Sequence, residues 1–364
     1  MALTKVSTGV VDMSGSTGGL VIAKGTTAQQ LICNPPTTNN LGSIRENIDS
    51  GVNKVEVCTS TGWQFLEEVG PTTVPLTVDY LVIAGGGSGG EIGGGGGAGG
   101  FRTSFGTGNI NGGLQSVENS LSLSLSTPYS ITVGAGGIPS GAQTTPSGSG
   151  GNSILSTFVE SIGGGGGGSY ISDGASGGSG GGGSSGGSVQ SGGLRASNPI
   201  QGFNGGANSL TSPYPAGGGG GAYSIGVVGN GGSAMESSIT GTPTDYAGGG
   251  GGGNQRGYYG GSTSLYLGGG GGAGDGSGTS TGQPATNNTG SGGGGGGFTG
   301  TYYVGGSGGS GVVILRYPSS YTIDTTQIGS DLSSTNNNSV SGYTITTIIC
   351  ANSATTGTGT IQFT

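Results

Sequence analysis

A run of glycines after an apolar segment has the spacing of a dinucleotide-binding fingerprint. The segment Tyr80 to Ala84 is followed by a match to G-x-G-x-x-G, at Gly85, Gly87 and Gly90. That pattern binds a pyrophosphate only where its last glycine opens a helix, with a carboxylate about 20 residues further on. Here glycines continue to Gly100, and each costs a helix about 1 kcal/mol relative to alanine. No carboxylate lies between Glu91 and Glu118, so we exclude this site and expect no cofactor.

Other catalytic arrangements lack their residues. No lysine follows Lys54 to serve a P-loop, and the chain has no histidine for a Ser-His-Asp or Cys-His arrangement or for the usual zinc ligand sets. The cysteines are too widely spaced for a metal motif, so we expect no metal site and interpret them as small buried apolar residues, with a Cys33–Cys58 pair as the alternative. They are Cys33, Cys58 and Cys350.

The acids of the glycine-rich region are scattered singly, so we interpret them as solvated carboxylates and expect no enzyme. They are Glu160, Asp173, Glu236, Asp245 and Asp275. The alternative is a surface-glycan depolymerase that uses an unrecognised carboxylate pair, which would require two carboxyl groups about 5–10 Å apart in one cleft.

Composition limits the kind of core that the chain can form. Of its 364 residues 97 are glycine and only 29% are hydrophobic, whereas globular domains have about 45–50% apolar residues. The net charge of −8 argues against nucleic acid and anionic lipid, which both attract basic surfaces. No apolar run is long enough to span a membrane, and the first residues lack the apolar stretch of a signal peptide. We therefore expect no membrane insertion and a product made in the cytoplasm.

Composition divides the chain into three regions: 1–75, 76–317 and 318–364. The first holds the lysines and the only tryptophan, the second nearly all the glycine, and the third is rich in Thr, Ser and Asn. No segment has a convincing helical period. The predicted fold is therefore all-β with a central polyglycine II helix bundle and essentially no α-helix.

The bundle is predicted from nearly pure glycine runs that end abruptly in Tyr, Phe or Val. A flexible Gly/Ser linker is the alternative interpretation. Polyglycine II is a left-handed helix with three residues per turn and about 3.1 Å rise, and without Cβ atoms such helices can pack side by side through backbone hydrogen bonds. We expect four runs to lie side by side: 217–221, 248–253, 268–272 and 292–297.

Ordinary β-structure is expected to clamp these runs. The segments Val78–Ala84 and Gly311–Tyr317 are apolar on both faces, as in buried strands, and are expected to pair. Leu121–Val133 alternates apolar and polar residues like one strand. An apolar cluster before the second large glycine run is expected to hold the bundle in place as an apolar staple. It comprises Ile154, Leu155, Phe158 and Ile162.

Two regions resemble known protein families. The motifs "AKGTTAQQ" at residues 23–30 and "LGSIRENIDSGVNKVEVCTSTGWQFL" at residues 41–66 resemble an N-terminal module of bacteriophage tail fibres. The middle region, from "YLVIAGGG" to "GGSGGSGVVILRY", is similar to the glycine-rich domains of phage fibres and polyglycine II tip adhesins.

The resemblance implies a tail fibre or fibre-tip adhesin of a virion, assembled in the host cytoplasm, that recognises a surface glycan or an outer-membrane protein of a bacterium. Residues 1–75 would attach to other virion proteins. A homotrimer is implied, with a monomeric tip as the alternative. A passive fibre shaft or head-decoration protein, without receptor binding, is the alternative function.

Aromatic loops are the candidate receptor site, because tyrosine offers rigid contact area with a polar tip. The alternative is that they plug the ends of the glycine helices. Since successive straight runs reverse direction, the pairs Tyr258–Tyr259 and Tyr302–Tyr303 are expected at one end of the bundle. Tyr223 and Tyr266 are expected at the other end. The candidate receptor residues are Arg256, Tyr258, Tyr259, Tyr302 and Tyr303.

Overall fold

A computed structural model describes residues 76–108, 110–255 and 266–364, together with the backbone of four strands nearer the N-terminus. The chain divides into two units, Met1–Val74 and Pro75–Thr364. In the first unit the strands form one sheet in the order β1-β2-β3-β4. Their bounds are Lys24–Gly25, Ile44–Asn47, Lys54–Thr59 and Gly62–Phe65. The backbone of the tail-fibre-like motif thus forms the antiparallel ladders β2–β3 and β3–β4.

The second unit is built from strands, turns and extended glycine segments. Its described residues contain one short 3-10 helix, η2 (Gly112–Leu114), and no α-helix, which confirms the prediction of an all-β chain. The strands are β5 Leu76–Ile83, β6 Phe101–Thr103, β7 Leu121–Leu123, β8 Pro128–Val133, β9 Ser153–Leu155, β10 Val159–Ser161, β11 Met235–Ser237, β12 Thr244–Tyr246, β13 Val312–Pro318, β14 Ile323–Asp324, β15 Leu332–Asn337, β16 Tyr343–Cys350 and β17 Gly357–Phe363.

Two sheets pack face to face at one end of this unit. One has the order β15-β16-β13-β5-β6, with β7 also paired to β5, and the other has the order β10-β9-β8-β17-β14. The predicted pairing of the two apolar segments is confirmed, because β5 and β13 are antiparallel neighbours with Tyr80 opposite Leu315. Alternate residues of both sheets fill the space between them, among them Val82, Leu315 and Phe363.

The opposite face of β5 and β13 is also covered, which explains why these strands are apolar on both faces. The hairpin β11–β12 contributes Met235 and Tyr246 to a second apolar cluster with Leu81 and Ile314. Burial on both faces gives an unbroken apolar run rather than alternation.

The expectation of one strand over Leu121–Val133 is wrong. The chain forms β7, which pairs with β5, and then β8, which pairs with β17 in the other sheet. Ser126 has a positive φ of 56° at the turn between them, and Leu125 is exposed. Alternation of residue types does not mark the place where a chain crosses from one sheet to the other.

The compositional boundary at residue 318 does not coincide with a boundary in the structure. Strand β16 pairs with β13, and β17 pairs with β8, so the last residues complete both sheets. Cys350 is buried between them, as expected for a small apolar residue, and its thiol is free. The side chains of Cys33 and Cys58, and hence their alternative pairing, lie outside the described residues.

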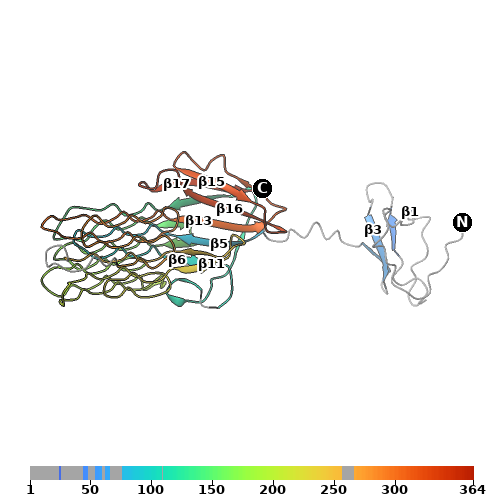
Figure 1. The fold of residues 1–364 in the computed structure, drawn as a ribbon. Helices are drawn as coiled ribbons and strands as arrows, with labels where there is room; N and C mark the ends of the chain where they lie inside the picture. The colour runs from blue at the N-terminus through green and yellow to red at the C-terminus, as the bar shows by residue number, and fades with distance from the viewer. Residues whose placement is uncertain are drawn as a thin grey trace. The chain divides into compact units, whose positions relative to one another are not determined.

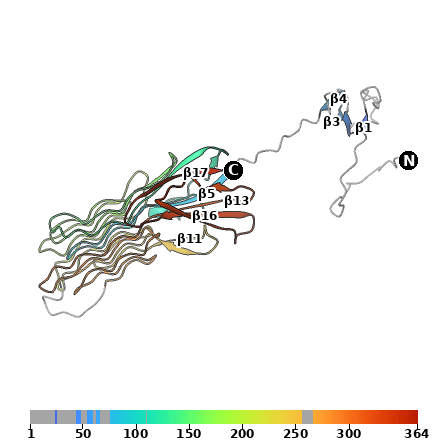
Figure 2. The ribbon, with the colours of Figure 1, turned by 90° about the horizontal axis from the view of Figure 1, so that it is seen from above.

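The glycine segments run side by side from the strands to the opposite end of the unit (Figures 1 and 2). The segment 93–100 lies in their interior. Its N–H groups donate in turn to carbonyl groups of three neighbouring segments. Residues 93, 96 and 99 donate to residues 296, 293 and 290, and residues 94, 97 and 100 donate to residues 168, 165 and 162. Residues 95 and 98 donate to residues 217 and 220. The same neighbour therefore recurs at every third residue.

Three further segments donate to the carbonyl groups of segment 93–100. The N–H groups of residues 253 and 250 donate to the carbonyl groups of residues 93 and 96, and those of residues 182 and 179 donate to residues 95 and 98. The N–H groups of residues 90, 87 and 84 donate to residues 94, 97 and 100. One glycine-rich segment thus has six hydrogen-bonded neighbours, all of them from the same chain.

The expected backbone bonds between the runs are present. Gly219 donates to Gly250, Gly269 to Gly249, and Gly292 to Gly248. The run 268–272 does not cross the bundle, because Gly270, Gly271 and Gly272 have φ values of 84°, 58° and 82° and form a turn, closed by a bond from Ala273 N to Gly270 O. Glycine is the residue that adopts such positive φ without strain, so a glycine run can also be a reversal.

Candidate functional site

The bundle has a strand end, where the sheets lie, and an opposite end that we call the loop end. Strand β5 leads directly into segment 84–90, so Glu91 and Ile92 lie at the loop end. Tyr170 N donates to Glu91 O at 2.9 Å, and Ile92 N to Tyr303 O at 3.4 Å. Three loops distant in sequence therefore meet there.

An aromatic cluster, Tyr170, Phe298 and Tyr302, forms at this end. The ring centroids of Tyr170 and Tyr302 are 5.7 Å apart in an edge-on arrangement, and those of Phe298 and Tyr302 are 5.0 Å apart. Tyr302 remains 38% exposed. Such contacts hold a ring in place while leaving part of it available to a partner.

The predicted receptor residues are only partly covered by the structure. Tyr302 and Tyr303 lie at the loop end, and Tyr303 is half-buried, with its hydroxyl 3.3 Å from Thr299 Oγ1. Arg256, Tyr258 and Tyr259 lie outside the described residues. The run 248–253 before them is parallel to 292–297, with bonds from Gly292 to Gly248 and from Gly295 to Gly251, so both runs end at the loop end.

The other two tyrosines do not share an end. Tyr223 lies at the strand end as expected, beside Ala222, which packs in the second apolar cluster. Tyr266 does not, because no glycine run separates it from the run 248–253, which ends at the loop end. Gly269 N donates to Gly249 O, while Tyr266 O lies near Gly251, so this segment leads away from the loop end.

Two members of the aromatic cluster were missed by sequence reasoning. Tyr170 follows the run 163–168, which is antiparallel to 93–100, as is 292–297. Because both runs therefore lead toward the loop end, Tyr170 lies there together with Tyr302. Phe298 directly follows the last run, so its position was also available from the sequence.

Glu91 is a buried carboxyl at the loop end. It is 7% exposed, and its Oε2 atom has no hydrogen-bond partner. Burial raises the pKa of this carboxyl above its ordinary value. Ser169 Oγ accepts from Glu91 N at 3.3 Å, and Tyr170 N donates to Glu91 O.

Two of the remaining acids accept hydrogen bonds from backbone N–H groups. Asp173 Oδ1 accepts from Ser191 N at 2.6 Å, and Asp275 Oδ1 from Gly268 N at 2.8 Å. Asp275 is half-buried rather than solvated, whereas Glu160, Asp173, Glu236 and Asp245 are exposed as expected. Glu236 and Asp245 lie directly opposite each other on β11 and β12, and both are exposed.

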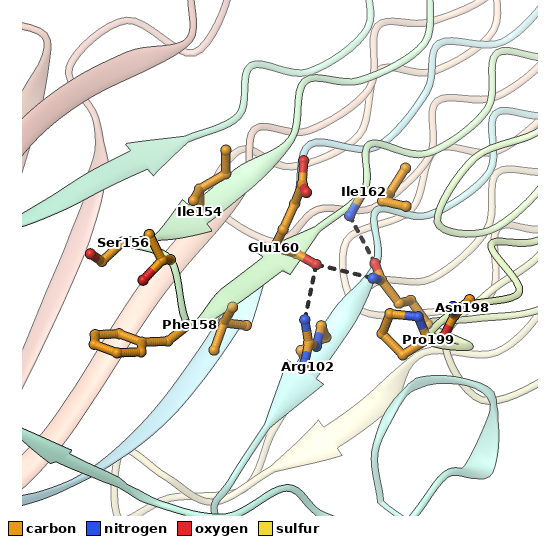
Figure 3. Close-up of a pocket in the computed structure, with 11 residues that line it drawn as sticks. Arg102, Ile154, Ser156, Phe158, Glu160, Ile162, Asn198 and Pro199 are labelled. Carbon is orange, nitrogen blue, oxygen red and sulfur yellow. Dashed lines mark hydrogen bonds between the residues drawn. The ribbon is translucent and has the colours of Figure 1, made fainter.

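A pocket of about 460 Å³ lies between the β9–β10 hairpin, β6 and residues 198–201 (Figure 3). The Glu160 carbonyl accepts from Arg102 Nη1 at 3.3 Å and from Gln201 Nε2 at 3.0 Å, and Gln201 Oε1 accepts from Ile162 N at 2.8 Å. The Glu160 side chain points away from Arg102 and binds Asn152 Nδ2. These polar groups are hydrogen-bonded to one another.

The predicted apolar staple is only partly correct. Leu155 is 1% exposed and belongs to the core between the sheets. Ile154, Phe158 and Ile162 line the pocket instead, and Phe158 is 44% exposed.

Arg102 is fixed on its other side by Glu118. Its Nε donates to Glu118 Oε1 at 2.8 Å, and the same carboxylate accepts from Tyr80 Oη at 2.7 Å and Asn111 Nδ2 at 3.0 Å. Burial acts to raise the pKa of Glu118, but the hydrogen bonds from Arg102, Tyr80 and Asn111 and the charge of Arg102 lower it below its ordinary value. Burial, with the bond to Glu118, raises the pKa of Tyr80, which keeps its phenol protonated.

Acid is expected to weaken the fold through this carboxylate. A carboxyl whose pKa is lower in the folded chain stabilises the fold at pH values above its pKa in the unfolded chain, which is about 4.3. This contribution is lost as the pH falls through the pKa of the folded chain. Glu118→Gln should lower the free energy of unfolding by about 1–3 kcal/mol at neutral pH and lose less stability on acidification than the wild type. Urea titrations at several pH values measure both effects.

The control is Asp245→Asn, which alters an exposed acid and should follow the wild-type pH profile. Parallel loss of stability in wild type and Glu118→Gln would contradict the assignment.

The fold is a bundle of glycine segments that is held by two β-sheets at one end and carries loops at the other end. Among the described residues no group of three or more Cys, Asp and Glu could hold a metal ion, and no helix is long and apolar enough to cross a membrane. The sequence model of the family described as "Glycine-rich domain" matches residues 67–318, more than half of the chain, and the protein belongs to this family. No curated protein and no solved structure matches it.

Proposed function

We propose that this protein is a structural and adhesive component of a bacteriophage tail fibre that contacts the host cell through the loop end of its bundle. The observation that carries the proposal is the aromatic cluster of Tyr170, Phe298 and Tyr302, which a rigid scaffold presents with Tyr302 still 38% exposed. Binding residues are concentrated on loops that a rigid scaffold positions. The tail-fibre-like motifs at residues 23–66 support the assignment to a virion.

We further propose that the crossing segments are polyglycine II helices. A helix with three residues per turn points every third N–H in the same direction. The recurrence of one neighbour at positions 93, 96 and 99, and of another at 94, 97 and 100, is the pattern that such a helix requires.

Partners follow from this assignment as proposals. Residues 1–75 would attach to other virion proteins, and the loop end would bind a surface glycan or an outer-membrane protein of the bacterium. The six neighbours of segment 93–100 come from one chain, so the bundle interior needs no second copy. A homotrimer would therefore associate through other surfaces, and the monomeric tip stays as the alternative.

Removing the exposed aromatic surface should weaken binding to cells. We expect Tyr302→Ala to reduce the affinity of the purified chain for whole bacteria of a susceptible strain by at least about tenfold, because a buried aromatic anchor contributes about 2 kcal/mol or more to an interface. Labelled chain bound to cells, measured against concentration, gives the affinity. Resistant mutants of the same strain should not bind the wild-type chain.

Tyr223→Ala is the matched control, because Tyr223 is 51% exposed at the strand end; it should bind like the wild type. Unchanged binding by Tyr302→Ala would refute the receptor role, and absence of binding by the wild type to any strain would favour a passive shaft or head-decoration protein. Release of reducing sugar from cells would favour the depolymerase, and loss of solubility of Tyr302→Ala would favour a plug at the bundle end.

A further inference from the structure

Strand β15 (Leu332–Asn337) is an edge of the six-stranded sheet and is six residues long. Every other edge strand that the structure describes in the second unit is only two or three residues long. These strands are β6, β7, β10, β11, β12 and β14. An edge strand presents unpaired N–H and C=O groups to which another chain can bind, and a short edge limits such pairing. Strand β15 therefore offers the longest open row of backbone groups in this unit.

Two of the short edges are also covered by Gln201. Phe101 N of β6 donates to the Gln201 carbonyl at 3.1 Å, outside the ladder with β5. Beside β10, Gln201 Nε2 donates to Glu160 O at 3.0 Å, and Gln201 Oε1 accepts from Ile162 N at 2.8 Å (Figure 3). A neighbouring strand would bind the same kinds of backbone groups. The chain thus closes these edges with its own residues.

Strand β15 has none of these protections. Apart from the ladder with β16, residues 333–337 form no backbone–backbone hydrogen bond with any residue that the structure describes. The six pairs of that ladder are consecutive, so β15 has no bulge, and residues 332–343 include no charged residue and no proline. Bulges, charges and prolines are devices that keep an edge strand from pairing. Since alternate residues of an antiparallel strand direct their N–H and C=O groups away from the neighbour, about half of these groups in β15 face outward.

The residues of β15 fit a second copy of the same strand. Two identical antiparallel strands are related by a two-fold axis, and residues directly opposite each other then lie on the same face of the sheet. With the axis at Ser334 or at Thr335, the central pairs consist only of Ser, Thr and Asn. Hydroxyl side chains that face each other across strands can form hydrogen bonds, and no like charges meet. The strand is therefore complementary to itself.

We propose that β15 pairs antiparallel with β15 of a second copy of this chain, so that the two six-stranded sheets continue into each other. The other edges are too short or are covered, so the pairing ends with two copies and gives a closed dimer rather than a filament. This contact is independent of the proposed receptor role, because β15 belongs to the sheets at the strand end and leaves the loop end free.

Sedimentation of the full chain over a concentration series tests the proposal. The average mass of the wild-type chain should rise toward twice its value at low concentration, and amide exchange of residues 333–337 should slow in parallel. Thr335→Lys and Thr335→Glu each place like charges near the two-fold axis, which opposes pairing. Each variant alone should associate at least about tenfold more weakly than the wild type. An equimolar mixture of the two should associate again, because opposite charges then meet.

Thr358→Lys is the matched control, because Thr358 is exposed on β17, which lies between β8 and β14 and is not an edge; it should associate like the wild type. The proposal is overturned if mass and exchange in β15 do not depend on concentration, if either Thr335 variant associates as tightly as the wild type, or if their mixture does not associate. Protection of β15 that arises only when a different protein is added would also overturn it.

Discussion

Gly96→Ala should unfold the glycine bundle. Gly96 is at the centre of segment 93–100, where its N–H donates to Gly293 O at 2.8 Å and its carbonyl accepts from Gly250 N at 2.8 Å. A Cβ atom added there would overlap the backbone carbonyl of Gly87. Overpacking a core usually costs about 1–3 kcal/mol, and backbone, unlike a side chain, cannot rotate away. We expect a loss of at least about 3 kcal/mol, measured by urea unfolding.

Gly187→Ala is the control for the intrinsic effect of alanine. Nothing lies within 4 Å of a Cβ atom at Gly187, and its φ is not in the positive range. Alanine there should stabilise the fold by about 0.4–1 kcal/mol, because it restricts the unfolded chain. Equal changes for both variants would refute close backbone packing. Chemical shifts of Gly94–Gly97 that depart from φ near −75° and ψ near +145° would refute the polyglycine II conformation.

Leu315→Ala should destabilise the sheets and the bundle together. Leu315 is 0% exposed on β13, opposite Tyr80 of β5, in the core between the sheets. Truncation of a buried leucine costs about 2–5 kcal/mol. The pure glycine runs bury no side chain, while ordering each residue costs about 1–2 kcal/mol, so the bundle depends on the strands that clamp it. Amide exchange at Gly95–Gly97 should accelerate along with exchange in β5.

Val189→Ala is the comparison for this variant, because Val189 is 66% exposed; its stability should change by less than about 0.5 kcal/mol. If Leu315→Ala accelerated exchange in the sheets and left the bundle protected, the bundle would be a separate cooperative unit and the clamp interpretation would be wrong.

The position of the bundle in the chain connects these two predictions with the proposed function. It is an insertion between two paired central strands, β5 and β13. Insertions whose ends lie close together are tolerated when the strands that hold them are stable. Loops at the far end can then change without altering the core, which suits a surface that must follow changes in its partner.

The sequence alone determined the features that depend on residue type. Glycine content disfavoured helices, the apolar runs identified β5 and β13 as buried partners, and the absence of histidine excluded Ser-His-Asp and Cys-His arrangements. Tyr302 and Tyr303 follow the last glycine run, 292–297, so the sequence placed them at an end of the bundle.

Only the tertiary structure decided which glycine segments are neighbours, that 270–272 is a turn, and that Leu121–Val133 divides between two sheets. It also decided which polar groups meet, as with Arg102 and Glu118 or Thr346 and Asn336. The physical reason is that glycine has no side chain to distinguish one run from another. Every run offers the same N–H and C=O groups, so the strands and turns at its ends, which are fixed by distant side-chain contacts, select its partners.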